Sequence, residues 1–241
     1  MLSLIEEQKK VFLECERNRV FYLLMISSGL LGAFTYSIRG GVFCNAQTGN
    51  VVLISMALGN GDWKGAAYYL IPITAYGLGA AATEILPGFV KKTGLLRWDT
   101  LLVGFEAIVT LTLGFLPESA PHHVSQVAIN FICSMQFNTF RRAEGFPMAT
   151  TFCTNHICQV GINLAKWLKK RDTLYFTKCR RHVEMLLMFI AGAVTGTVLC
   201  GLFLGKAIFL GSFLLFVVFV DLLHADLTKE NGMLGRVPEG H

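Results

Sequence analysis

Two clusters of amide and hydroxyl side chains interrupt an otherwise apolar chain, and such groups can replace the hydration shell of a small polar solute or ion. Gly49, in the first cluster, permits a close approach of the backbone to a solute. The same side chains could instead only hydrogen-bond neighbouring helices, so both interpretations stay open. The candidate residues are Asn45, Gln47, Thr48, Gly49 and Asn50 in the first cluster, and Thr151, Thr154, Asn155 and Gln159, with His156 among them, in the second.

Three further polar residues fall inside apolar segments. Gln136 and Asn138 lie near the end of the segment 124–140, and Glu106 lies about eight residues into the segment 99–116. A carboxylate inside a membrane is costly and marks a functional site by default. Glu106 therefore either exchanges protons or stays neutral and bonds to a facing helix. We include all three among the candidate substrate-binding residues.

The sequence contains no pattern typical of an enzyme, a metal site or a cofactor site. No HExxH, GxSxG or paired-aspartate motif is present, and the loops are too short for a catalytic domain. His122 and His123 are adjacent, but the neighbouring residues supply no further metal ligands. The seven cysteines lack CxxC spacing, and we expect them to be small packing residues.

Composition indicates an integral membrane protein. Of 241 residues, 53% are hydrophobic and only 15% are charged, and the mean hydropathy is +0.53. A soluble domain carries about a quarter charged residues. The formal net charge of +5 is expected to orient loops at a membrane rather than to bind nucleic acid. The expected fold is therefore all-α and polytopic, in contact with membrane lipid.

Six segments have the length and composition of membrane spans, which need roughly 17–25 apolar residues. Two others, 42–58 and 146–165, begin with polar residues and are expected to be broken or re-entrant. In the first of these, the apolar part is only eight residues long, about 12 Å as a helix. The six predicted spans are 20–38, 65–83, 99–116, 124–140, 185–205 and 207–223.

The positive charges favour six spans over eight. If the segments 42–58 and 146–165 are both re-entrant, 18 of the 21 Lys and Arg residues lie on the cytoplasmic side. If both segments cross the membrane fully, the eight spans place only 14 of them there. Both chain termini are then cytoplasmic in a multi-pass protein of the cell membrane. The predicted organisation is an amphipathic lead-in at 1–19, one transmembrane domain at 20–223, and a cytoplasmic tail at 224–241.

The six-span arrangement also predicts an inverted repeat, with halves at 20–117 and 124–223. Thr48 and Thr154 are 106 residues apart, and Val20 and Val124, which open the two halves, are 104 apart. Paired interrupted helices in an inverted repeat are common in transporters. Gly192 and Gly196, like Gly201 and Gly205, have GxxxG spacing, which permits close packing within the chain or in a homo-oligomer.

Arg39 directly follows the first predicted span. It is expected to be an anchor at the membrane interface, with attraction of anions as the alternative.

Two stretches resemble a known family. Gly41, Val42, Phe43, Thr48, Gly49 and Asn50 match the block GVFxxxxTGN, which follows the first span in the YoaK-type family of small bacterial membrane proteins of unknown function. A second, more degenerate family block resembles Gln136 and Asn138 followed by Arg141 or Arg142, and then Thr151 and Thr154. The resemblance covers about residues 20–223 and implies a polytopic membrane protein.

The chain departs from the family pattern at two places. The family usually has an aspartate in the first span, but the stretch from Gly29 to Ser37 contains no acid, and Asn155 stands where a glycine is usual. Proton coupling through that aspartate is therefore not expected. The leading hypothesis is a transporter or channel for a small polar or ionic solute that binds between two broken helices. The alternative is a non-transporting membrane scaffold or regulatory protein.

Overall fold

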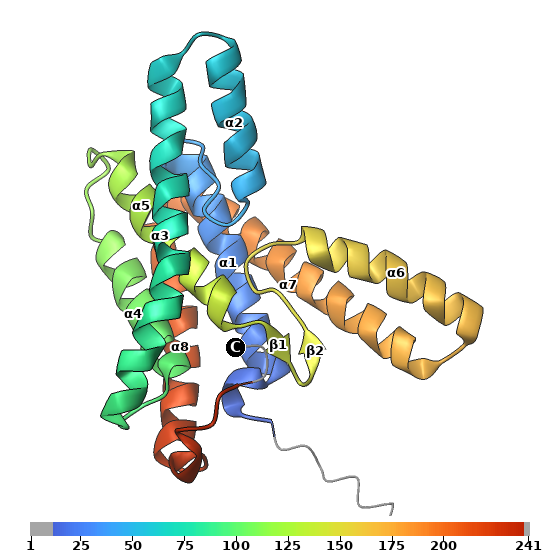
Figure 1. The fold of residues 1–241 in the computed structure, drawn as a ribbon. Helices are drawn as coiled ribbons and strands as arrows, with labels where there is room; N and C mark the ends of the chain where they lie inside the picture. Colours follow the sequence, from blue (N-terminus) through green and yellow to red (C-terminus); the bar gives the residue numbers. More distant parts are fainter. Residues whose placement is uncertain (1–11, 239–241) are drawn as a thin grey trace, which may run out of the picture.

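The computed structural model describes residues 12–238, and within them the chain is almost entirely helical (Figure 1). A two-residue antiparallel strand pair, β1 (Arg142–Ala143) and β2 (Phe146–Pro147), lies between the fifth and sixth helices. The α-helices are α1 (Asn18–Ile38), α2 (Gln47–Gly59), α3 (Trp63–Thr93), α4 (Trp98–Leu113), α5 (His122–Thr139), α6 (Thr154–Lys170), α7 (Thr173–Phe203) and α8 (Ile208–Leu227), and the 3-10 helices are η1 (Glu14–Glu16), η2 (Leu204–Ala207) and η3 (Asn231–Met233).

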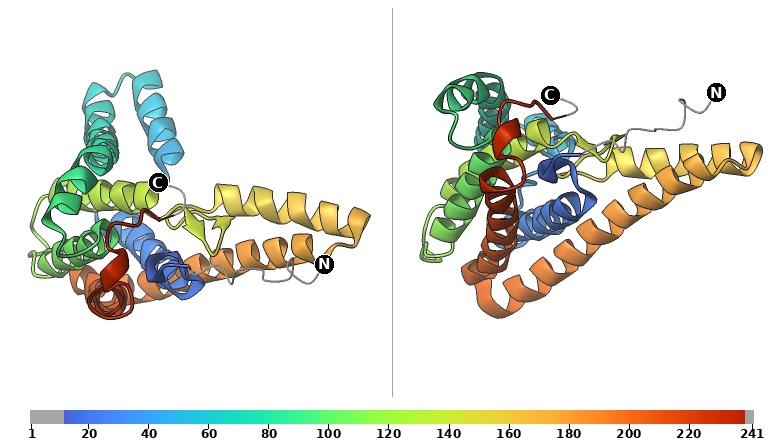
Figure 2. Two further views of the ribbon diagram at one scale, coloured as in Figure 1. Left: turned by 60° about the horizontal axis from the view of Figure 1, so that its bottom comes forward. Right: turned by 90° about the horizontal axis from the view of Figure 1, so that it is seen from below.

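Two helical hairpins extend away from a central bundle. One consists of α2 and the first part of α3, and the other of α6 and the first part of α7; the views in Figures 1 and 2 agree on this arrangement. Helix α3 packs on α2, and α7 packs on α6. The remaining parts of α3 and α7, together with α1, α4, α5 and α8, form the bundle.

Length and composition identify a membrane protein. Three helical stretches of the described chain are long and apolar enough to cross a membrane: Asn18–Ile38, Trp63–Lys92, and Thr173–Leu227, which includes both α7 and α8. Large apolar side chains are also exposed along these helices, as at Leu78, Val194 and Phe213. Exposed apolar surface of this extent is typical of a face that contacts lipid.

The bundle is held by close helix pairs. Helix α1 packs on α7 and α8, α3 packs on α5, and α4 packs on α8 and α5. Gly192 and Gly196 of α7 face α1, where a Cβ on Gly192 would overlap the main-chain carbonyl oxygen of Ile26. This GxxxG pair therefore serves packing within the chain. A Cβ on Gly201 of the second GxxxG pair would meet nothing within 4 Å, whereas Gly205 contacts the side chains of Arg39 and Glu118.

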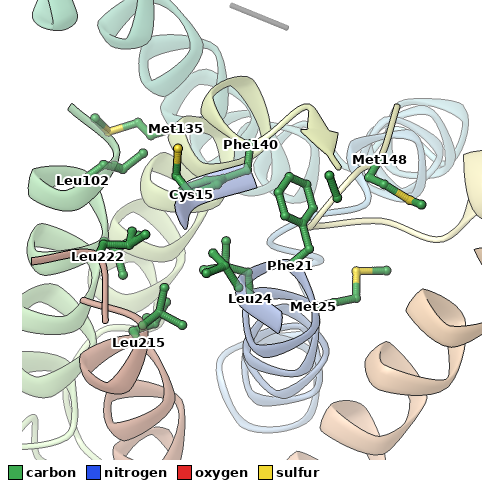
Figure 3. Packing of buried hydrophobic residues seen from close by; sticks show 14 of the residues in the cluster. Cys15, Phe21, Leu24, Met25, Leu102, Met135, Phe140, Met148, Leu215 and Leu222 are labelled. Atoms are coloured by element: carbon green, nitrogen blue, oxygen red, sulfur yellow. The ribbon is translucent and has the colours of Figure 1, made fainter. Parts of the chain in front are cut away.

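An apolar core fills the end of the bundle near the N-terminal residues (Figure 3). Phe21 packs edge-on against Phe140 with ring centroids 6.0 Å apart, which joins α1 to the end of α5. Leu102 of α4 and Leu215 of α8 belong to the same buried cluster. Burial of such side chains contributes about 1.5–3 kcal/mol each, so this cluster fixes how the two halves of the chain meet.

Charged residues join both ends of the described chain to the α3–α4 loop. Asp226 accepts from the main-chain N–H of Arg97 at 3.0 Å, and Glu230 accepts from the main-chain N–H of Glu14 at 2.7 Å. The Arg97 guanidinium also lies 3.4 Å from Asp99. Burial raises the pKa of Glu230, although the bond from Glu14 and the nearby Arg97 act in the opposite direction. We call these five residues the terminal cluster.

The helices run beyond several predicted boundaries. The predicted spans 65–83 and 185–205 lie within α3 and α7, each of which has 31 residues. Pro72 and Pro87 both lie inside α3 without ending it. The region predicted as the tail, 224–241, begins with the last turn of α8 and then joins the terminal cluster through Glu230. Most of the predicted amphipathic lead-in, at 1–11, lies outside the described residues.

Candidate functional site

The candidate site is built around the loops that precede α2 and α6. Helix α1 ends at Ile38, and the chain continues through Gly40 and Gly41, whose φ angles of +82° and +70° are readily adopted only by glycine. The chain then crosses back toward the middle of α1 before α2 begins at Gln47. A longer loop, which contains β1 and β2, connects the end of α5 to the start of α6.

Asn50 holds the first loop in place. Its side-chain oxygen accepts from the Phe43 N–H at 3.0 Å, and its amide donates to the Phe43 carbonyl at 2.7 Å and to Gln47 at 3.0 Å. Gln47 in turn donates to the side chain of Asn130 in α5 at 2.8 Å. Asn50 is fully buried, so these bonds satisfy groups that water cannot reach.

Both loops are tied to Ser28, the middle residue of α1, the first directly and the second through Gln136. Asn45, in the loop before α2, donates its amide to the Ser28 carbonyl at 3.1 Å. Gln136 of α5 donates to the Ser28 hydroxyl at 3.1 Å and to the carbonyl of Thr150, in the loop before α6, at 3.4 Å. The beginnings of the two short helices are thus tied to one point of the bundle.

Buried hydroxyls without partners lie beside Ser28 and in the loop before α6. The side-chain oxygens of Ser27 and Thr150 are buried and make no hydrogen bond to any described residue, whereas the buried Thr151 hydroxyl interacts with the Tyr76 hydroxyl. Ser27 is adjacent to Ser28, and Thr150 and Thr151 belong to the loop that Gln136 contacts. An unsatisfied buried polar group costs about 1–3 kcal/mol, so the Ser27 and Thr150 hydroxyls call for an explanation such as a bound solute or water.

Glu106 is buried in the interior of α4. Its side chain is 1% exposed, and neither carboxylate oxygen has a hydrogen-bond partner among the described residues. The residue one turn later, Thr110, donates to the Glu106 main-chain carbonyl at 2.8 Å, so it does not satisfy the carboxyl group. A buried carboxyl without a partner inside an apolar helix is costly, so Glu106 stays a candidate for contact with a solute or a cation.

A buried histidine pair lies next to the second loop. His156 of α6 and His182 of α7 have their Nδ1 atoms 2.9 Å apart, and His156 Nε2 lies 2.8 Å from the Ala149 carbonyl. The sequence drew attention to His156 as a member of the second cluster, but nothing in the spacing connected it to His182, 26 residues later.

Other predicted site residues lie outside this buried network. Thr48 and Thr154, which open α2 and α6, are exposed. Asn138 is bonded to Ser134 and Arg141 and lines a surface cleft with Glu84. In α6, Asn155 and Gln159 are half-buried, and Gln159 accepts from Asn163. Gly49 packs against the ring of Phe43.

Arg39 is enclosed by protein side chains. Its side chain is 1% exposed because it turns inward over the Phe34 ring and lies 3.4 Å from Glu118 of the α4–α5 loop. Its main-chain carbonyl accepts from Gln126 at 2.7 Å. Ser28 and Gln126 were not among the predicted site residues, although serines and glutamines in the middle of apolar segments are the signal that could have found them.

Comparison with known proteins agrees with the family indicated by the sequence. No curated protein and no solved structure matches the chain. A family model described as "Protein of unknown function (DUF1275)" matches residues 20–220, from the start of α1 to within α8. The match includes both polar loops and every helix of the bundle. The chain is therefore a member of the DUF1275 family of proteins of unknown function.

Proposed function

We propose that this protein moves a small polar or ionic solute across a membrane, through a site between the beginnings of α2 and α6. The observation that carries the proposal is that the loop before α2 bonds Ser28 directly and the loop before α6 bonds it through Gln136, with unpartnered buried hydroxyls at Ser27 and Thr150. The N-terminus of a helix presents free N–H groups and a partial positive charge, which suit the binding of polar or anionic groups.

Helix packing supports an inverted repeat, with α1–α4 corresponding to α5–α8. If the two halves are exchanged, the α1–α7 contact corresponds to the α5–α3 contact. In the same way, α2–α3 corresponds to α6–α7, and α1–α8 corresponds to α5–α4. All six of these helix pairs are in contact. The α4–α8 and α1–α5 contacts map onto themselves, as they would across a two-fold axis. Such symmetry is the usual basis of alternating access in transporters.

Glycine packing gives the same correspondence independently. A Cβ on Gly192 would overlap the Ile26 carbonyl oxygen, where α7 crosses α1. A Cβ on Gly79 would overlap the Phe131 carbonyl oxygen, where α3 crosses α5. The repeat therefore has support from helix packing as well as from the distribution of charge.

Six membrane spans remain the arrangement that we propose, with α2 and α6 as re-entrant helices. Helix α2 has 13 residues, about 20 Å at 1.5 Å per residue, which is too short for a hydrocarbon core about 30 Å thick. Backbone that is not helical at membrane depth must be buried in protein or line a cavity. The buried bonds of Asn45 and Asn50 meet that requirement.

Topology can be tested with a membrane-impermeant thiol reagent in a cysteine-depleted background. Single cysteines are placed by Asp62→Cys, Thr93→Cys and Thr173→Cys. The six-span arrangement places position 62 outside and positions 93 and 173 inside, so only position 62 should be labelled in intact cells. Labelling of position 93 alone would instead support eight spans and remove the inverted repeat.

Transport itself is tested in proteoliposomes. Osmotic swelling reports the entry of small neutral polar solutes, and currents on solid-supported membranes report ions. Thr150→Val removes one unpartnered hydroxyl with little change in shape, and we expect it to lower flux by about tenfold, an effect near 1.4 kcal/mol. Thr197→Val, on the exposed face of α7, is the matched control and should leave flux unchanged. Flux equal to that of empty liposomes for every solute would contradict the proposal.

A scaffold without transport is the second candidate, and one observation favours it. The amides of Asn45, Gln47 and Asn50 are all bonded within the protein, as expected for groups that join helices rather than contact a solute. Under this alternative, Thr150→Val would change neither flux nor solute-dependent stability. The hydroxyl group of Thr150 therefore separates the two functions better than the amides do.

A further inference from the structure

We propose that the end of the α6–α7 hairpin binds the headgroups of anionic phospholipids. We call residues 166–181 the basic tip. This segment has seven Lys and Arg residues and a single acid, Asp172. Asp172 caps α7 by accepting from the Leu174 N–H at 2.8 Å, so its carboxylate is already bonded within the tip.

Most cations of the basic tip have no acidic partner among the described residues. Arg180 pairs with Glu184 at 3.3 Å, and Arg181 pairs with Glu144 at 2.9 Å. The other five make no such pair, and four of them are exposed. Unpaired cations held close together repel one another, so they attract a surface of opposite charge. These five residues are Lys166, Lys169, Lys170, Arg171 and Lys178.

Aromatic rings arrange these cations. Around the Tyr175 ring lie the ammonium groups of Lys166, Lys170 and Lys178, at 5.7, 5.3 and 5.9 Å from its centroid. The Arg171 guanidinium lies 5.6 Å from the Trp167 ring. Tryptophan and tyrosine favour the headgroup level of a bilayer, where one end of the ring is apolar and the other is wet.

Exposed apolar side chains accompany the charges. Leu168 is 52% exposed, and Phe176 is 48% exposed beside Trp167, with ring centroids 5.2 Å apart. Charged and apolar groups segregate to different faces of α6, and its lysines all lie near its C-terminal end, so a re-entrant α6 places them at the headgroup level. The tip therefore combines an electrostatic and an apolar contribution, as stable binding to a bilayer surface requires.

The end of the α2–α3 hairpin lacks this cluster of cations. It has one acid, Asp62, in the turn and one base, Lys64, in the first turn of α3, although the two hairpins correspond in the proposed repeat. The difference distinguishes one end of the molecule from the other. In the six-span arrangement the basic tip faces the cytoplasmic leaflet, where anionic lipids give a negative surface potential.

Lipid binding can be measured on the full-length protein in detergent by native mass spectrometry. The probe is an equimolar mixture of palmitoyl-oleoyl phosphatidylglycerol and phosphatidylcholine. We expect the wild type to retain phosphatidylglycerol preferentially, and 0.5 M salt to weaken this preference in a matched solution titration. A lysine near an anionic surface contributes about fivefold in affinity. Lys166→Gln, Lys169→Gln and Lys170→Gln together should therefore weaken phosphatidylglycerol binding by roughly tenfold or more.

A matched control neutralises three lysines elsewhere, by Lys64→Gln, Lys91→Gln and Lys92→Gln, and should leave the lipid preference unchanged. Thermal unfolding checks that both triple variants are folded, as expected because the substituted side chains are exposed. Equal binding of the two lipids by the wild type, or wild-type affinity in the tip variant, would overturn the proposal. Tighter binding of a short single-stranded RNA than of phosphatidylglycerol micelles would also overturn it and identify a nucleic-acid site.

Discussion

The Nδ1 atoms of His156 and His182 lie 2.9 Å apart, so a single proton joins α6 to α7 in the protein interior. A carbonyl can only accept, so the contact of His156 Nε2 with Ala149 assigns a proton to Nε2 of His156. Nδ1 of His156 is then the acceptor, and Nδ1 of His182 is the donor. A second proton between the rings would place two N–H groups face to face.

Loss of this bond should destabilise the protein. His182→Ala leaves Nδ1 of His156 buried without a partner, which costs about 1–3 kcal/mol. We expect a lower midpoint of thermal unfolding in detergent at neutral pH. The control is His224→Ala, in the last turn of α8, where the side chain is exposed. Equal midpoints for the two variants would show that the histidine bond contributes nothing.

Close packing of α1 and α7 should not tolerate a side chain at position 192. Gly192→Val places methyl groups against the Ile26 carbonyl and forces the helices apart, with an expected cost of about 1–3 kcal/mol or more. Gly201→Val lies on the same helix, where an added Cβ meets nothing within 4 Å, and it should unfold at the wild-type temperature. If both variants unfold together, the described contact between α1 and α7 is wrong.

In the first polar cluster, substitution of the buried Asn50 should lower stability, whereas substitution of the exposed Thr48 should not. Asn50→Ala removes both bonds to the Phe43 backbone and leaves buried groups unsatisfied, so the unfolding midpoint should fall. Thr48→Ala changes an exposed side chain and should leave the midpoint within error of the wild type. A loss of flux in Thr48→Ala, with stability unchanged, would add Thr48 to the residues that contact solute.

Glu230 should make stability depend on pH. Burial raises its pKa in the folded protein above the ordinary value of 4.5, so the folded state disfavours the carboxylate. The stability associated with this group is fully present below about pH 4.5 and is lost as the pH rises through the folded pKa.

Glu230→Gln keeps an oxygen that can accept from Glu14 but carries no charge. The variant should therefore be more stable than the wild type at pH 7, and the difference should shrink as the pH approaches 4.5. Denaturation series at several pH values would show this. Asp62 is exposed, but it would be a poor control for the loss of a carboxylate because its side chain caps α3. Equal pH profiles for the variant and the wild type would contradict the assignment.

Much of the helical organisation could be predicted from the sequence. Apolar segments of nearly 20 residues indicated α1, α5 and α8 within a few residues, because a helix in an apolar setting must satisfy its own backbone. Polar runs near Asn45 and Thr151 indicated where the helices break. Helix α7, however, begins 12 residues before the predicted span, because the charged residues from Thr173 onward pack on α6.

By itself, the sequence determined that the chain is a helical membrane protein of the DUF1275 family, with two polar interruptions, since composition and local pattern are properties of the chain. Only the tertiary structure decided which polar residues meet. Ser28 and Gln136 together join loops that lie more than 100 residues apart in the chain, and His156 contacts His182 on another helix. The spacing of residues in the sequence indicates which side chains are neighbours along one helix. Contacts between helices depend instead on where the helices cross, and here α7 crosses α1 at the close approach of Gly192 to Ile26.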